Sequence, residues 1–132
     1  MNLMNRHILL LSASLLLGGN ASADGLPNCS RSGSEFAQCG ATWERVFQSS
    51  NQLDTTRTAW EAGSFESFVT GVSLATLQKK WCPRSPFSSD AIIAVVAKYV
   101  REHPEDWSDS PLNLVTKPLA LAYGCNKPLR SP

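Results

Sequence analysis

The sequence has no apolar run long enough to cross a membrane. Its longest run, residues 8–17, is about half the length of the roughly 20 residues that a membrane-spanning helix needs. Arg6 precedes this run, and the small residues Ala21, Ser22 and Ala23 follow it, which is the pattern of a cleavable signal peptide. We therefore expect residues 1–23 to be a signal peptide. We expect the mature chain to be exported without a membrane anchor, since no cysteine follows the run closely enough to carry a lipid.

A clear excess of charge of either sign is also missing. The chain has 12 lysines and arginines against 11 aspartates and glutamates. The predicted signal peptide contains only one of these, Arg6, so the mature chain has 11 of each sign. A protein whose main partner is nucleic acid or an anionic membrane usually carries a clear basic excess. The balance argues against both partners and leaves local charged patches open.

Histidine is scarce, and His103 is the only one outside the predicted signal peptide. The sequence also lacks the GxSxG and SxxK motifs, in which a serine acts as nucleophile. It has no glycine-rich loop of the kind that binds phosphate. Glu102, Glu105 and Asp106 flank His103 and could orient it for acid–base chemistry or for metal binding. The alternative, which the preceding helical pattern favours, is that His103 ends a helix. We expect no enzyme, no cofactor and no metal site.

The four cysteines, Cys29, Cys39, Cys82 and Cys125, form neither a CxxC pair nor a CxxCH motif. Their spacing argues against a zinc site and against covalently attached haem. An even number of cysteines in a small exported chain is typical of disulfides formed in an oxidising compartment. We expect two disulfides, and the residues alone leave three connectivities open.

Strand-like alternation is absent from the segments between turn signals, where apolar residues recur with the period of a helix. The mature chain, residues 24–132, is long enough for one small domain and too short for two. The expected fold class is all-α, a small helical bundle of four to five helices with two disulfides.

The first part of the chain predicts one long helix and one short one. Residues 34–50 are expected to form the long helix, whose apolar face consists of Phe36, Cys39, Gly40, Trp43, Val46 and Phe47. Asp54 is expected to cap a short turn or helix that runs through Trp60 and breaks at Gly63.

Residues 64–81 are expected to form a central helix, because apolar residues lie on two of its sides. Gly71 is expected to allow another helix backbone to approach closely. The first side contains Phe65, Phe68, Val69 and Val72, and the second contains Leu74, Leu77 and Trp81.

Two further helices are predicted by their caps. Ser88 or Ser89 caps the first, which is expected to end near residue 102 or 103 because Pro104 follows. Ser110 caps the second, and Pro118 inside it predicts a kink or a break. The inward residues are expected to be Ile92, Ile93, Val96, Tyr99 and Val100 on the first helix, and Leu112, Val115, Leu119 and Ala122 on the second.

The stretch HPEDWSDSP between these helices places a tryptophan among residues that prefer water. We consider it a candidate interface with a large aromatic anchor and an acidic rim. The alternative is that the ring of Trp107 folds back over the helix ends. Trp43 and Trp81 are expected in the core. The interface candidates are Glu105, Asp106, Trp107, Ser108 and Asp109.

Four segments follow one another in a fixed order: FESFVTGV at residues 65–72, CP at 82–83, VVAKYVREHPE at 95–105, and a final helix that closes on GC at 124–125. In this order they resemble the Rap/Tai immunity proteins. The resemblance covers residues 34–125, preceded by an N-terminal extension at 24–33 and followed by a C-terminal tail at 126–132. The matching motif positions, which the resemblance implies to be largely structural, are Phe68, Gly71, Cys82, Pro83, Lys98, Tyr99, His103, Pro104 and Cys125.

The resemblance implies an exported helical protein that binds a peptidoglycan-cleaving amidase toxin of a type VI secretion system in the periplasm and blocks its active cleft, often as a homodimer. Two disulfides, Cys82–Cys125 and Cys29–Cys39, are expected from it. Two alternatives stay open. One is a periplasmic helical module without a toxin partner, and the other is a small metal-binding protein or enzyme centred on His103.

Overall fold

The computed structural model describes residues 25–49, 55–84 and 86–126, so the expected signal peptide lies outside the described residues. Within these ranges the chain forms four α-helices and one short 3₁₀-helix, and no strand beyond an isolated bridge between Leu77 and Trp81. The all-α fold is confirmed. The elements are α1 (Gly33–Ser49), α2 (Thr56–Thr76), α3 (Ser89–Glu102), η2 (Pro104–Ser108) and α4 (Pro111–Tyr123).

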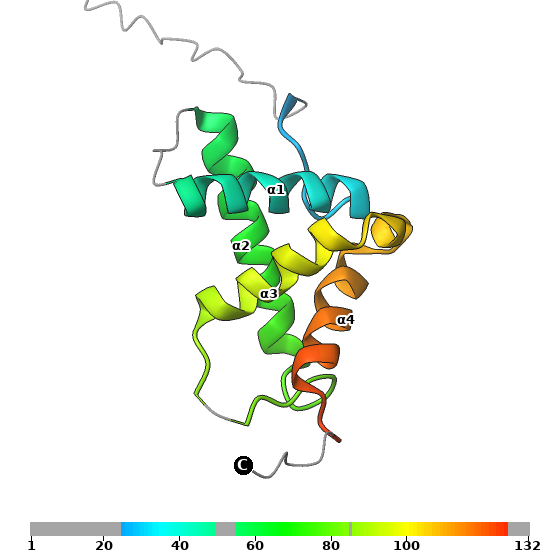
Figure 1. Ribbon diagram of the computed structural model, residues 1–132. Coiled ribbons are helices and arrows are strands. Elements are labelled where there is room, and N and C mark those ends of the chain that lie inside the picture. The colour runs from blue at the N-terminus through cyan, green and yellow to red at the C-terminus, as the bar shows by residue number, and fades with distance from the viewer. Residues whose placement is uncertain (1–24, 50–54, 85, 127–132) are drawn as a thin grey trace, which may run out of the picture.

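The helix α2 contacts the other three α-helices. In Figure 1, α1 lies across α2, and α3 and α4 approach each other near η2. The core between them is aromatic at its centre, where the ring centroids of Phe36 and Phe65 are 4.8 Å apart. No helix in the described ranges has both the length and the apolar character needed to cross a membrane. The largest fully buried side chains include Trp81, Phe36, Phe65, Ile92, Ile93, Leu114 and Leu119.

The expected break at Gly63 is wrong, because α2 runs through it without interruption. Glycine inside a helix costs about 1 kcal/mol relative to alanine, and burial of Ala62 and Phe65 on either side outweighs that cost. The N-cap is Thr55, whose hydroxyl accepts from the amide of Thr58 at 3.1 Å. The cap expected at Asp54 lies outside the described residues.

The helix α2 ends at Thr76, five residues before the expected end at residue 81. Gln78 adopts a positive φ of 61°, and the amides of Lys79 and Lys80 both donate to the carbonyl of Thr76. This turn brings Trp81 back toward the helix, where its indole donates to the carbonyl of Ser73 at 2.9 Å. Trp81 is therefore in the core, as expected, but it reaches the core from a turn.

Two expectations about the outer face of α2 are wrong. Gly71 is exposed, and a Cβ built there would meet nothing within 4 Å, so no helix backbone approaches it. Leu74 is 61% exposed. A close approach occurs instead at Gly40 of α1, where a Cβ would lie 2.9 Å from the ring of Phe65.

The helix α3 has the expected cap, end and buried face. The hydroxyl of Ser88 accepts from the amide of Ala91 at 3.1 Å. His103 is the C-cap, and its amide donates to the carbonyl of Tyr99 at 2.9 Å. The buried residues are Ile92, Ile93, Val96, Ala97, Tyr99 and Val100.

The helix α4 begins as expected, with Ser110 as N-cap and Pro111 in the first position. It is not broken at Pro118, which is buried inside one continuous helix. Burial of the proline ring offsets the loss of one backbone hydrogen bond. The inward face differs from the expected one, because Leu112 is 50% exposed and Ala122 is also exposed, while Leu114 joins Val115 and Leu119 in the core.

The helix α1 starts one residue before the expected boundary. Phe47 does not belong to the buried face, since it is 60% exposed and stacks on Trp43 with a centroid distance of 4.9 Å. Phe47 lies near the C-terminal end of α1 and at the edge of its apolar stripe. A residue in such a position can be exposed although the apolar residues keep the helical period.

Both expected disulfides are confirmed. Cys29–Cys39 joins the segment before α1 to the middle of α1, and Cys82–Cys125 joins the segment after α2 to the segment that follows α4. The second link is reinforced by the amide of Cys82, which donates to the carbonyl of Tyr123 at 2.7 Å. The two disulfides therefore hold both ends of the described domain.

Candidate functional site

The acidic stretch that the sequence singles out forms η2, at the junction of α3 and α4 and beside the start of α1 (Figure 1). Glu105, Asp106, Trp107 and Ser108 lie within η2, and Asp109 is its C-cap. Pro104 occupies the first position, where its fixed φ suits the turn. The five interface candidates therefore lie together on one short element.

Asp106 ties η2 to the helices on both of its sides. Its Oδ2 accepts hydrogen bonds from the hydroxyl of Tyr99 on α3 and, at 2.6 Å, from Nζ of Lys117 on α4. The hydrogen bonds from Lys117 and Tyr99 hold the pKa of Asp106 below its usual range. The same carboxylate raises the pKa of Lys117, while burial and then the bond to Asp106 raise the pKa of Tyr99.

This arrangement makes Asp106 a structural residue of the turn. Its side chain is 19% exposed, and one of its oxygens has two partners from the same chain. A charge substitution at this position would change the conformation of η2 in addition to its surface. Other positions of η2 are therefore better probes of an interface.

Trp107 combines features of both interpretations drawn from the sequence. Its indole donates to the carbonyl of Val100 at 2.9 Å, which holds the ring against the end of α3. The residue nevertheless remains 37% exposed. The hydrogen bond fixes the orientation of the ring, so its exposed part is presented in one conformation.

Gly33, at the start of α1, packs directly against the main chain of η2 and its C-cap. A Cβ built there would lie 2.5 Å from the carbonyl oxygen of Asp109 and closer still to that of Trp107. Only glycine allows this contact between two main chains. The sequence gives no signal of it, because Gly33 and η2 are more than 70 residues apart.

His103 is in contact with both α3 and η2. Its ring stacks on that of Tyr99 with a centroid distance of 4.3 Å, and Nδ1 lies 2.9 Å from Oε1 of Glu105. The hydrogen bond from His103 lowers the pKa of Glu105. In the described ranges, no group of three histidine, cysteine or carboxylate side chains is placed to hold a metal ion. The contacts of His103 are those of a residue that ends a helix.

The residues of the structural motif are divided between core and surface. Tyr99 is buried and its hydroxyl donates to Asp106. Phe68 packs against the core, with its ring centroid 5.6 Å from that of Phe36. Pro104 is the first residue of η2. Lys98 and Gly71 are exposed, and Pro83 is half-buried beside the disulfide residue Cys82. Lys117 is a residue of the site that the sequence analysis missed, because it acts from another helix.

Fold and site together define a small, disulfide-bonded, all-α domain that presents a rigid charged turn at its surface. A family model describing the Rap1a immunity proteins matches residues 32–125, and the chain belongs to this family. The resemblance noted in the sequence is thus confirmed over nearly the same residues. The comparisons with curated proteins and with solved structures gave no significant match. Because an immunity protein acts by binding a toxin, family membership indicates a toxin as the partner.

Proposed function

We propose that this protein is a periplasmic immunity protein that binds and inhibits a peptidoglycan-cleaving amidase delivered by a type VI secretion system. The observation that carries the proposal is the family match over residues 32–125. The amidase as target and the periplasm as location come from the sequence resemblance. Two disulfides are consistent with an oxidising compartment.

The surface of η2 is the proposed contact with the toxin. The side chain of Glu105 is 66% exposed, Ser108 is exposed, and Trp107 offers part of an aromatic ring. Tyr99, Lys117 and Gly33 hold this surface in place before any partner binds. A preformed surface loses little conformational entropy on binding, so more of the interaction energy appears as affinity.

A one-to-one complex with loss of activity would establish the function. The oxidised protein is mixed with the product of the adjacent reading frame, and complex formation is measured together with cell-wall hydrolysis by that product. Inhibition at a stoichiometric ratio supports the proposal. Full hydrolysis in the presence of excess protein contradicts it and favours the helical module without a toxin partner.

The contact through η2 is tested separately by substitution. Trp107→Ala should weaken binding by about 2 kcal/mol if Trp107 is a hot spot, and Glu105→Lys should weaken it through unfavourable charge. Phe47→Ala removes another exposed aromatic ring, far from η2 in the sequence, and serves as the control. Unchanged affinity for the first two variants would place the interface elsewhere, for example on the loop around residues 84–89.

The remaining alternatives have direct tests. A metal-binding protein or enzyme centred on His103 predicts saturable binding of zinc or copper at micromolar concentration and its loss in a folded His103→Ala variant. We propose instead that the protein has no enzymatic activity, as expected for an immunity protein. The homodimer expected from the resemblance is tested by light scattering of the purified protein at several concentrations.

A further inference from the structure

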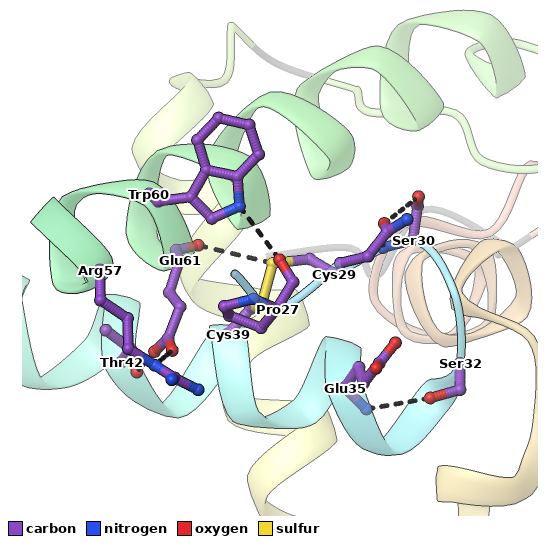
Figure 2. Close-up of a disulfide and its surroundings, with 11 residues drawn as sticks. Pro27, Cys29, Ser30, Ser32, Glu35, Cys39, Thr42, Arg57, Trp60 and Glu61 are labelled. Carbon is purple, nitrogen blue, oxygen red and sulfur yellow. Dashed lines mark hydrogen bonds and ion pairs between the residues drawn. A yellow bond between two sulfur atoms is a disulfide. The ribbon is translucent and has the colours of Figure 1, made fainter. Parts of the chain in front are cut away.

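Trp60 is the most exposed of the four tryptophans, at 50%, although α2 lies centrally in the fold. Its indole donates to the carbonyl of Pro27 at 3.0 Å, as Figure 2 shows. The polar atom of the side chain is thus satisfied within the protein, and the orientation of the ring is fixed. A large apolar ring held in water in this way is a common feature of binding surfaces.

Trp60 forms one side of a groove of about 710 Å³ between residues 26–31 and α2. The groove is also lined by the apolar residue Phe68 and by the polar residues Asn28, Ser64 and Ser67. Among the described residues that line it, Arg31 is the only charged one. Its side chain is 68% exposed, and its Nη1 lies 3.4 Å from Oε1 of Glu35. The groove therefore combines an aromatic anchor, small hydrogen-bonding side chains and one cation.

Both walls of the groove are fixed by contacts inside the protein. The wall formed by residues 26–31 is held by the Cys29–Cys39 disulfide, in which Cys29 is 3% exposed. The wall formed by α2 is held to α1 through buried Glu61, which accepts from Thr42 at 2.5 Å and from Arg57 at 2.8 Å (Figure 2). The groove is therefore preformed, as is common for binding sites.

The groove adjoins η2 through the residues that start α1. Arg31 lines the groove, and Gly33, two residues later, lies directly against the main chain of Trp107 and Asp109. The groove and η2 therefore lie on neighbouring elements, joined through the buried Gly33 at the start of α1.

We propose that the groove beside Trp60 is a second contact surface for the toxin, continuous with η2. This inference rests on the proposed function. A stable protein–protein interface uses about 20–30 residues on each partner, and η2 supplies five. The interface must extend beyond η2, and tryptophan and arginine are the residues that most often anchor such interfaces.

The chemistry of the groove defines the part of the toxin that it fits. A protruding loop with an apolar side chain would pack on the ring of Trp60, and a carboxylate or carbonyl beside it would accept from Arg31. The serines and Asn28 suit hydrogen bonds to a peptide main chain. Because Arg31 already pairs with Glu35, an acceptor on the partner would share this guanidinium. The exposed Glu105 of η2 instead favours a cation on the partner.

Another groove, of about 350 Å³, also adjoins η2, because it lies between α3 and α4 and is lined by Tyr99. Its exposed large apolar residue is Leu121, at 58%, and the described residues that line it include neither tryptophan nor arginine. Extension of the interface in this direction is the competing outcome, and Leu121→Ala probes it.

The test measures affinity and hydrogen exchange with the product of the adjacent reading frame. Trp60→Ala removes the anchor, and Ser67→Arg fills the groove while leaving the bond between Trp60 and Pro27 in place. We expect each to raise the Kd at least tenfold, mainly through faster dissociation. Phe47→Ala, with a similarly exposed ring outside the groove, should change the Kd less than twofold. The amides of residues 26–31 should gain protection from exchange in the wild-type complex.

The outcomes separate this inference from the proposed function. If the wild-type protein binds and inhibits the toxin, but Trp60→Ala and Ser67→Arg both stay within twofold of it, the groove is not part of the interface and only the inference fails. A loss caused by Leu121→Ala alone would also overturn it, in favour of the groove between α3 and α4. If the wild-type protein does not bind the toxin, the proposed function fails first.

Discussion

At Gly33, the start of α1 lies directly beneath the main chain of η2. The two carbonyl oxygens above it leave no room for a Cβ atom, and main-chain atoms move less easily than the end of a flexible side chain. The position of the proposed toxin contact therefore depends on a residue outside that contact, at a site where the sequence shows only a glycine near a helix start.

We predict that Gly33→Ala destabilises the protein by about 1–3 kcal/mol, the usual range for overpacking, and displaces η2. Gly71→Ala is the matched control, because a Cβ at Gly71 meets nothing within 4 Å and the residue lies inside a helix. This control should stabilise the protein by about 0.5–1 kcal/mol. Urea denaturation measures both changes. A neutral Gly33→Ala variant would mean that η2 moves away at no cost.

The contacts of Asp106 predict how stability depends on pH. Its pKa is lowered from 3.8 by bonds to Lys117 and Tyr99. A carboxyl group with a lowered pKa contributes stability that is present above its unfolded pKa and is lost as the pH falls through its folded pKa. The contribution should therefore be full at neutral pH and should disappear as the pH falls below about 4.

We predict that Asp106→Asn lowers the Tm at pH 7, and that the difference from the wild-type protein becomes smaller as the pH is lowered below 4. Glu66→Gln, an exposed carboxyl group on α2, should show no such convergence. Thermal unfolding followed by circular dichroism at several pH values measures it. A Tm difference that is constant with pH would show that the charge of Asp106 does not stabilise η2.

Among the elements, α2 ends in an unusual way. Gln78 follows the C-cap Leu77 and has a φ of 61°, the left-handed conformation that helices usually give to glycine at this position. We predict that Gln78→Gly stabilises the protein by up to about 1 kcal/mol, because the substitution relieves strain where glycine is favoured. Equilibrium unfolding in urea measures the change. A loss of stability would mean that the side chain of Gln78 contributes more than its backbone conformation costs.

The sequence predicted α3 in full and α2 only in part, for a physical reason. The cap, stripe and end of α3 are all local signals, set by Ser88, the apolar period and Pro104. At Gly63 and at Pro118, local signals for a break are outweighed by burial in the core. After Thr76 the helix ends earlier than expected, and a turn brings Trp81 into the core. Burial depends on the other helices, so the outcome at these positions could not be predicted from local sequence.

For the candidate site, too, the sequence predicted the local part and missed the contacts between distant residues. Its five residues are consecutive, so the sequence alone placed them on one turn. Its supports are not local, since Gly33, Tyr99 and Lys117 come from three different helices. The groove beside Trp60 was missed for the same reason, because residues 26–31 and α2 meet through a contact between residues far apart in the sequence, the hydrogen bond from Trp60 to Pro27.

For the whole molecule, the two disulfides differ in what they hold and in how exposed they are. Cys82–Cys125 spans 43 residues, which include α3, η2 and α4. In the chain-entropy model, a loop of that length stabilises the fold by about 4 kcal/mol. Cys29–Cys39 spans ten residues and lies in the core, where Cys39 is fully buried.

We predict that a thiol reductant under native conditions opens Cys82–Cys125 first, because Cys125 is exposed and Cys82 is half-buried, whereas neither Cys29 nor Cys39 is accessible. Alkylation followed by mass spectrometry should show modified Cys82 and Cys125 before the other pair. The half-reduced protein should unfold at lower urea but keep the groove beside Trp60, since the disulfide that fixes its wall is still closed. Simultaneous reduction of both pairs would show that opening one end of the domain unfolds all of it, and the two disulfides would then stabilise a single cooperative unit.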